Sequence, residues 1–147
     1  MDARIHQISQ FFDHYDQNFN AALNGKAVDI ERTANLFSNC FIEVSPAGIT
    51  CGQNNEQFRE AIPKGYEYYK SIGITSMNII SKETTLIDEF HSMVKIGWRS
   101  DFNKKDNTKG TIEFEVIYFL QAIRNENRIF AYITGDEQKV LKENGLI

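Results

Sequence analysis

The sequence predicts an α+β protein in which a curved antiparallel sheet wraps around three N-terminal helices and a short helix ends the chain. Apart from a short hairpin near residues 40–51, apolar residues repeat at three- and four-residue steps up to residue 73, and they alternate from Ile74 to residue 134. Helical patterns therefore come first and strand patterns last, an order typical of α+β folds. With 147 residues, 41% of them hydrophobic, the chain is long enough for one core, so we expect residues 1–147 to form a single domain.

Two helical patterns open the chain. Residues 2–23 carry one apolar stripe, and the pair Asn24-Gly25 after it is a stop signal. A short second helix is predicted to begin at Asp29, a good N-cap residue, and to reach Phe37.

A short hairpin and a third helix follow. Strand patterns at residues 40–45 and 49–51 flank a turn that contains a proline. The third helix begins at Asn54 or Asn55 and ends at Gly73. Pro63 lies inside it and is expected to kink or split it.

The second half of the chain alternates as a four-strand meander. The strands are predicted at residues 74–83, 90–103, 110–123 and 128–134. Thr134 and Glu137 have the spacing of a capping box for a last helix that ends near Gly145. Ile117 and Phe119 lie on the sheet face that the helices leave uncovered, so we expect a homodimer packed through the sheet.

Composition limits the partners and the compartment. With 16 basic and 20 acidic residues the net charge is −4, which argues against nucleic acid as a partner. The N-terminus shows no signal-peptide pattern, and the longest apolar run, residues 116–120, is far shorter than the roughly 20 residues a bilayer requires. We therefore expect a soluble, cytoplasmic protein without a membrane partner. Cys40 and Cys51 are expected to be buried free thiols.

The order and lengths of these elements resemble the nuclear transport factor 2-like superfamily, which includes ketosteroid isomerase, scytalone dehydratase and SnoaL-like polyketide cyclases. The resemblance covers nearly the whole chain, with local cues at residues 19–25, 34–37, 43–46 and 115–120 and in the closing stretch from Tyr132 to Leu146. It implies a cystatin-like cone with a pocket between the curved sheet and the helices. Because this fold hosts many unrelated activities, the function must be argued from the site.

The residues of ketosteroid isomerase have no counterparts at the matching positions. Phe19 stands where that enzyme has a tyrosine that donates to an oxyanion, and Ser45 stands where it has its aspartate base. Residues 116–123 contain no carboxylate for the third role. Since proton transfer between carbon atoms needs a base and an enolate stabiliser, we do not expect that activity.

Glu43 and His14 are the candidate catalytic residues. Glu43 lies two positions before Ser45 on the same strand face, where a carboxylate partly buried in an aromatic pocket could act as acid or base. A solvated strand-edge carboxylate is the alternative. His14 borders the apolar stripe of the first helix and could reach the pocket, whereas His91 begins a strand. No histidine cluster has metal-ligand spacing, so we expect neither a metal nor another cofactor.

Aromatic side chains with polar tips are the candidate ligand contacts, although the same spacing is typical of core residues. They are Tyr15, Phe19, Phe58, Tyr69, Trp98, Tyr118 and Tyr132. The sequence thus favours a protein that binds a small apolar molecule, with a cofactor-free isomerase, dehydratase or cyclase as its catalytic form. The alternative is a non-catalytic, dimeric protein-interaction module whose cone is filled by side chains.

Overall fold

The computed structural model describes residues 2–147. The elements in chain order are α1 (Ala3–Leu23), α2 (Ile30–Ala34), β1 (Phe37–Ser45), β2 (Gly48–Gln53), α3 (Glu56–Ser71), β3 (Ile74–Leu86), β4 (His91–Asn103), β5 (Lys109–Ile123), β6 (Glu126–Ile133) and α4 (Glu137–Glu143). Helices thus dominate the first half and strands the second, which confirms the α+β class.

The six strands form one sheet in the order β2-β1-β6-β5-β4-β3. Strands β3 to β6 make the predicted antiparallel meander. The hairpin of β1 and β2 joins this meander, because β1 lies beside β6 and runs parallel to it. The sheet is therefore mixed rather than antiparallel throughout. Alternation reports which faces of a strand are buried but not which strand is its neighbour, so the parallel pair had no signal in the sequence.

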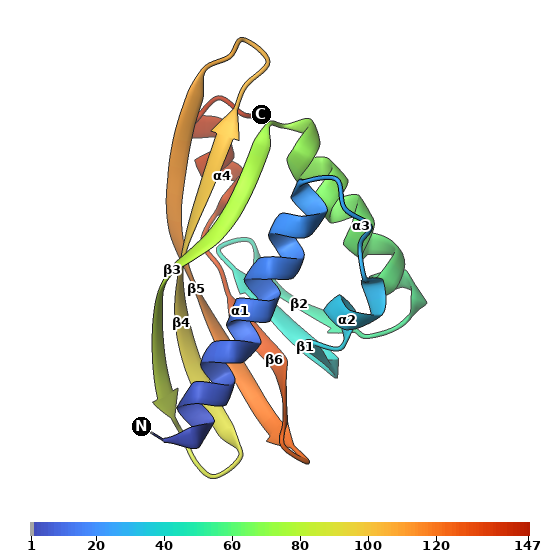
Figure 1. Cartoon of the computed structure of the whole chain (residues 1–147), viewed down its shortest axis with the longest axis vertical. Coiled ribbons are helices and arrows are strands. Elements are labelled where there is room, and N and C mark those ends of the chain that lie inside the picture. Colours follow the sequence, from blue (N-terminus) through green and yellow to red (C-terminus); the bar gives the residue numbers. More distant parts are fainter. Residues whose placement is uncertain (1) are drawn as a thin grey trace.

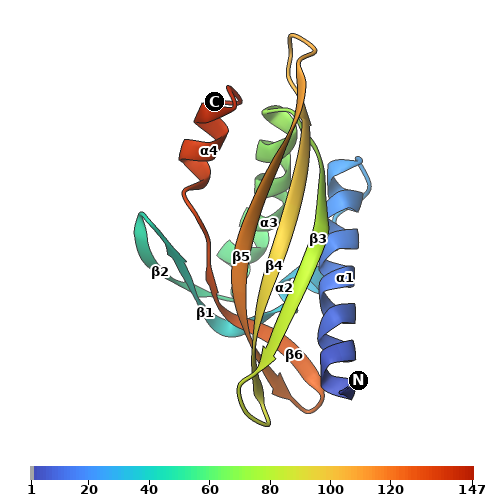
Figure 2. The ribbon, with the colours of Figure 1, turned by 90° about the vertical axis from the view of Figure 1, so that its left-hand side faces the viewer.

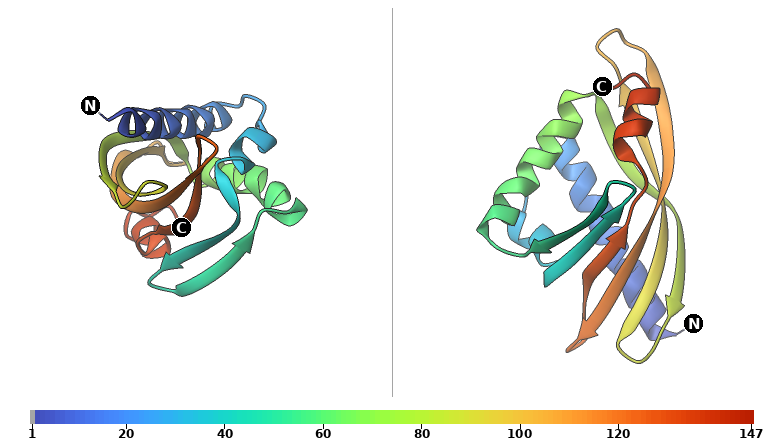
Figure 3. Two further views of the ribbon diagram at one scale, coloured as in Figure 1. Left: turned by 90° about the horizontal axis from the view of Figure 1, so that it is seen from below. Right: turned by 180° about the vertical axis from the view of Figure 1, so that it is seen from behind.

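The long strands twist and curl around the helical side of the molecule. In Figure 2, α1 runs beside β3 at one edge of the long strands, and α4 lies toward the other edge beside their upper half. α4 packs on the inner face, as the other helices do. Seen from below, the strands curl while α1 lies along one side of the curl (Figure 3). α3 completes this helical side next to α1 and α2 (Figure 1).

The core lies between α1 and the inner face of the sheet. Strand β4 alternates as predicted, with Val94, Ile96 and Trp98 buried and Lys95 and Arg99 exposed. The largest fully buried apolar side chains come from α1, β4, β5 and β6: Phe12, Ile8, Ile96, Leu120, Ile129 and Val94. The apolar faces that the periodicity identified on α1 and on the strands are thus buried against each other.

Most helix ends follow their local signals. The side chains of Asp2 and Asn55 cap α1 and α3. Gly25 and Gly73 follow the ends of the same two helices with φ angles of 80° and 101°, a left-handed conformation that glycine adopts without strain. None of the helices within residues 2–147 combines the length and the apolar character needed to cross a bilayer.

Two helices differ from their predicted form. Asp136, not Thr134, caps α4, because the Asp136 carboxylate accepts a hydrogen bond from the Lys139 backbone at 3.1 Å. Glu137 is therefore the first helical residue and does not complete a capping box. Pro63 does not split α3, which continues from Glu56 to Ser71. A proline inside a helix costs about 3 kcal/mol, which packing of the apolar face of α3 offsets.

The cysteines are exposed, contrary to the prediction that they would be buried. Cys40 is opposite Gln53 and Cys51 is opposite Ile42 in the β1–β2 ladder, and both thiols are free. Cys51 is exposed because β2 is an edge strand, with five of its six residues exposed. Cys40 precedes the buried Phe41 on β1, so its side chain points to the opposite, exposed face.

Side chains of helix α1 form hydrogen bonds with the backbone of the other edge strand, β3. The Asn20 amide donates to the Met77 carbonyl at 2.6 Å and accepts from the Met77 N–H at 2.8 Å. The Asp16 carboxylate accepts from the Ile79 N–H at 3.2 Å. The helix thereby satisfies backbone groups that an edge strand leaves unpaired.

We expect Asn20→Ala to destabilise the fold by about 1–3 kcal/mol, because both part-buried backbone groups of Met77 would lose their partner. Urea unfolding at neutral pH measures the change. Gln17→Ala, an exposed position on the same helix, is the matched control and should leave the free energy of unfolding unchanged. Equal stability of the two variants would show that the Asn20 bonds do not hold α1 on the sheet.

Candidate functional site

A cavity of about 320 Å³ lies between the inner face of the sheet and helices α1 and α3. We call it the main cavity. Glu43 lines it together with all of the aromatic residues that the sequence analysis assigned to a pocket: Tyr15, Phe19, Phe58, Tyr69, Trp98, Tyr118 and Tyr132. The volume is at the lower end of the range of about 300–1,000 Å³ that small-molecule sites occupy.

Three neighbouring strands place Glu43 in this wall. Tyr118 on β5 is opposite Tyr132 on β6, and Tyr132 is opposite Glu43 on β1. Directly paired residues project from the same face of a sheet. The parallel pairing of β1 with β6 therefore puts Glu43 in line with the partly buried Tyr132 and the buried Tyr118.

The hydroxyl and indole groups of three aromatic residues form one cluster in the main cavity. The indole N–H of Trp98 donates to the Tyr118 hydroxyl at 3.1 Å. The Tyr15 ring lies 5.7 Å from the Trp98 ring and 6.1 Å from the Tyr118 ring, measured between centroids. Burial raises the pKa of both tyrosine hydroxyls well above their ordinary range. A tyrosine with the ordinary pKa of about 10 is already neutral at physiological pH. The raised pKa keeps the hydroxyls of Tyr15 and Tyr118 protonated further into the alkaline range.

Two carboxylates stand on the solvent-facing side of the main cavity, each beside a tyrosine. The Tyr69 hydroxyl donates to Glu137 Oε1 at 2.7 Å. Burial, followed by the charge of Glu137, raises the pKa of Tyr69 far above its ordinary range. Burial and the charge of Glu43 do the same to Tyr132. Both glutamates are exposed, so water reaches the acids while the tyrosines are largely shielded from it.

Aromatic rings form the apolar walls. Phe19 meets Tyr66 edge to face with centroids 5.0 Å apart, and Phe37 meets Phe58 in the same manner at 5.4 Å. Such walls offer flat apolar surfaces to a ligand while the hydroxyl cluster offers it hydrogen bonds. The arrangement combines an apolar enclosure, neutral donors and ionisable acids.

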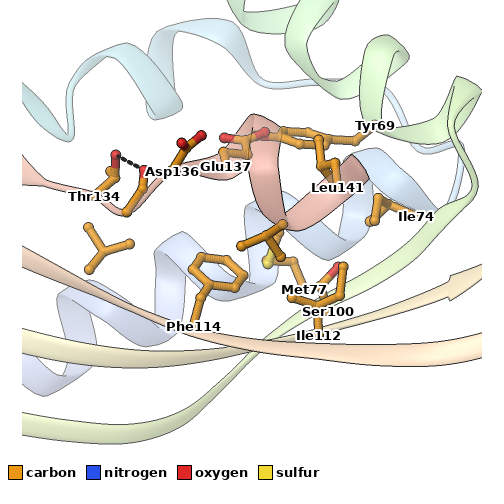
Figure 4. Close-up of a pocket in the computed structure, with 13 residues that line it drawn as sticks. Tyr69, Ile74, Met77, Ser100, Ile112, Phe114, Thr134, Asp136, Glu137 and Leu141 are labelled. Atoms are coloured by element: carbon orange, nitrogen blue, oxygen red, sulfur yellow. Dashed lines mark hydrogen bonds between the residues drawn. The ribbon is translucent and has the colours of Figure 1, made fainter. Parts of the chain in front are cut away.

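A second cavity of about 120 Å³ adjoins the first between the sheet and α4 (Figure 4). We call it the annex. The two cavities share the residues Tyr69, Met77, Phe114, Val116, Thr134 and Glu137. They are therefore separated only by side chains that line both.

Two sequence expectations, for His14 and Glu43, need correction. His14 is exposed and does not line the main cavity, because Tyr15 and Phe19 point there and a neighbouring helical position faces about 100° away. Glu43 lines the cavity but is exposed rather than partly buried. His91 lies away from the cavity, with its ring nitrogens 2.8 Å from Asp88 Oδ1 and 3.1 Å from Gln121 Nε2.

Residues 2–147 contain no group of three or more His, Cys, Asp or Glu side chains arranged to hold a metal ion. The acids of the main cavity, Glu43 and Glu137, come from different ends of the chain. Each has a tyrosine neighbour rather than a second protein ligand for a metal.

Glu137 is a site residue that the sequence analysis missed. It was interpreted as part of a capping box, and its partner Tyr69 lies 68 residues away in the chain. The only signal in the sequence is its type and position, an acid four residues after Ile133, the last residue of β6. Nothing local showed which helix that strand end would meet.

Comparison with known proteins identifies a family and several solved structures to which this chain is similar. A family model described as NTF2-like protein (DUF6841) matches residues 6–137. Among curated proteins, no match to this chain was found.

Several solved structures have the same fold at low sequence identity. An NTF-2 like protein of unknown function from Shewanella oneidensis MR-1 superposes with a TM-score of 0.66 and 16% identity, covering 90% of this chain and 99% of that one. A ketosteroid isomerase-like protein from Erwinia carotovora atroseptica gives 0.65 and 13%, with 92% and 97% covered.

An NTF2-like protein with a cystatin-like fold from Novosphingobium aromaticivorans gives a TM-score of 0.67 and 9% identity, covering 97% of this chain and 87% of that one. Identities this low establish the fold alone. The family match over residues 6–137 goes further and shows that the chain belongs to the NTF2-like protein family DUF6841.

Proposed function

We propose that this protein binds a small, flat, mostly apolar molecule in the main cavity and that Glu43 exchanges a proton with it. The observation that carries the proposal is the cavity of about 320 Å³ that brings Glu43 and all of the expected aromatic side chains together. A filled cone, which the non-catalytic alternative requires, leaves no such volume. The name of the ketosteroid isomerase-like relative is consistent with this chemistry but does not identify a substrate.

The donors and the acid suit proton transfer next to a carbonyl group. In such a step the Glu43 carboxylate would take a proton from the carbon beside the carbonyl, and the electron pair would move onto the carbonyl oxygen. Tyr118 already accepts a bond from Trp98, so its own proton is available to that oxygen. A preorganised donor in a water-poor site stabilises a developing oxyanion more strongly than water does.

The donor cluster differs from the one that the resemblance implies. The positions of Phe19 and Ser45 provide no such groups, whereas Tyr15, Trp98 and Tyr118 provide hydroxyl and indole donors from other elements. The proposal therefore concerns a carbonyl compound as a class and does not revive ketosteroid isomerase activity.

The two-ring ketone 2-tetralone is a suitable probe. Trp98 is the only tryptophan in the chain and lines the main cavity, so quenching of its fluorescence reports binding. We expect Glu43→Gln to keep binding but to slow deuterium uptake at the carbons beside the carbonyl about 100-fold or more, as loss of a general base does. Proton NMR in D₂O measures the uptake.

Glu60→Gln, an exposed glutamate of α3 outside the cavity wall, is the control and should match the wild type. If 2-tetralone leaves Trp98 fluorescence unchanged in the wild type, the proposal that the protein binds this class of ligand is wrong. If Glu43→Gln exchanges deuterium at the wild-type rate, the ligand site stands and the role of Glu43 is wrong.

Buried tyrosines also make stability depend on alkaline pH. The pKa values of Tyr15, Tyr69, Tyr118 and Tyr132 are raised above the ordinary 10.0 in the native state. Below pH 10 both states keep these protons, so they contribute no pH dependence there. Above pH 10 the unfolded chain loses protons that the native state retains, and the free energy of unfolding falls.

Urea unfolding between pH 8 and pH 11 is therefore expected to show a plateau followed by a decline, with these limits bracketing the ordinary tyrosine pKa of about 10. Tyr118→Phe removes one of the retained protons and should make the decline shallower. The same slope in both proteins would mean that Tyr118 is not shielded in the native state.

We also propose that the protein is a homodimer joined through the outer face of the sheet, because that face carries a continuous apolar patch. Ile117 is opposite Ile133, and Phe119 is opposite Ala131, which is itself opposite Ile42. Ile42 and Ile133 are each 41% exposed. Exposed apolar residues that adjoin across strands are typical of an interface, whereas scattered ones are not.

Ile133→Glu is expected to convert a dimer to a monomer, because it would bury a charge in the interface. Sedimentation velocity at micromolar concentration measures this. Ile80→Glu is the control, since Ile80 is also exposed but lies on the edge strand β3. A wild-type protein that sediments as a monomer would contradict the proposed dimer.

A further inference from the structure

The annex has an apolar deep end and a polar entrance. Ile74, Met77, Ile112 and Leu141 surround its deep end, whereas Thr134, Asp136 and Glu137 lie toward its other end, as Figure 4 shows. Its volume of about 120 Å³ has room for a short substituent of a ligand seated in the main cavity. Apolar cavities of similar size, about 150 Å³, stay dry and accept a benzene molecule.

Ser100 is the polar exception at the deep end. Its side chain lines the annex and is 2% exposed, and its hydroxyl has no hydrogen-bond partner among the described residues. In Figure 4 the hydroxyl points away from the strands and into the annex. Buried hydroxyl groups almost always have a partner, so an orphan of this kind calls for a molecule that the protein itself does not supply.

A single water is a poor candidate for that partner. A buried water normally needs two to four polar contacts. Ser100 is opposite Met77 on one neighbouring strand and opposite Ile112 on the other. Both residues turn apolar side chains toward the annex, so Ser100 would be the only side chain at this end to hold a water.

The annex continues the main cavity rather than standing alone. Phe114 and Val116 line both cavities, and so do Tyr69 and Glu137, whose hydrogen bond marks the shared wall. A ring placed against the aromatic walls of the main cavity can therefore carry a side arm into the annex. The arm would meet apolar walls first and the Ser100 hydroxyl at the end.

We propose that the natural ligand is an aromatic or alicyclic ring with a short apolar arm that ends in a hydroxyl or carbonyl group, and that Ser100 binds this terminal group. The inference rests on the proposed ligand site in the main cavity. It adds a second recognition point, which distinguishes an arm with a polar end from a purely apolar arm of the same length.

Three phenols test the arm and its terminus separately: phenol, 4-propylphenol and 4-(3-hydroxypropyl)phenol. Dissociation constants come from quenching of Trp98 fluorescence. In the wild type, both arms should strengthen binding relative to phenol, because each fills the annex. Ser100→Ala should weaken binding of the hydroxyl-terminated arm about tenfold, the usual cost of one lost buried hydrogen bond, and should leave 4-propylphenol unchanged or tighter.

Ser92→Ala is the matched control, since Ser92 is a buried serine on the same strand and lines neither cavity. It should bind all three phenols as the wild type does. Val140→Phe fills the annex from the α4 side without touching the main cavity. It should abolish the advantage of both arms and preserve phenol binding.

The results separate this inference from the proposed function. If phenol binds but neither arm improves the affinity, the annex is not part of the site while the main-cavity proposal stands. If Ser100→Ala binds both arm-bearing phenols with wild-type dissociation constants, Ser100 is not the recognition group. Failure of all three phenols to quench Trp98 would overturn the ligand site and this inference with it.

Discussion

The parallel pairing of β1 with β6 is the constraint on which the candidate site depends. Without it the N-terminal hairpin would be a separate ribbon, and Glu43 would not face the sheet's interior. The pairing puts Glu43 beside Tyr132, which is itself beside Tyr118 in the next strand. One ladder therefore brings residues 43, 118 and 132 to the same wall.

Differences in burial give the tyrosines and the glutamates around the main cavity different properties. Apolar surroundings favour the neutral form of an acid, so Tyr15 and Tyr118 stay protonated to a higher pH than an exposed tyrosine does. The glutamates lie where solvent reaches them. An interior with neutral donors inside and carboxylates outside can hold a polar atom of a ligand and exchange a proton with it, while the rings bind its apolar part.

The two faces of the sheet have separate roles. The inner face carries the aromatic residues of the cavity, and its helices α1 and α3 cover them. The outer face carries two rows of paired apolar residues: Ile117 with Ile133, and Phe119 with Ala131 and Ile42. The chain's own helices cover only the inner face, and an exposed apolar patch of this kind is typical of an interaction surface, which supports the proposed dimer.

Local periodicity determined much of this protein from sequence: the helix-to-strand change at Ile74, the alternation that points Trp98 and Tyr118 inward, and the aromatic set of the cavity. It could not determine the partner of β1, the exposure of Cys40 and Cys51, or the direction of His14. It also could not reveal the meeting of Glu137 with Tyr69 or the orphan hydroxyl of Ser100. The physical reason is separation along the chain. Periodicity shows which side of a helix or strand avoids water. Strand pairings, cavities and missing hydrogen-bond partners depend instead on distances between residues far apart in the sequence, and only the folded structure decides these.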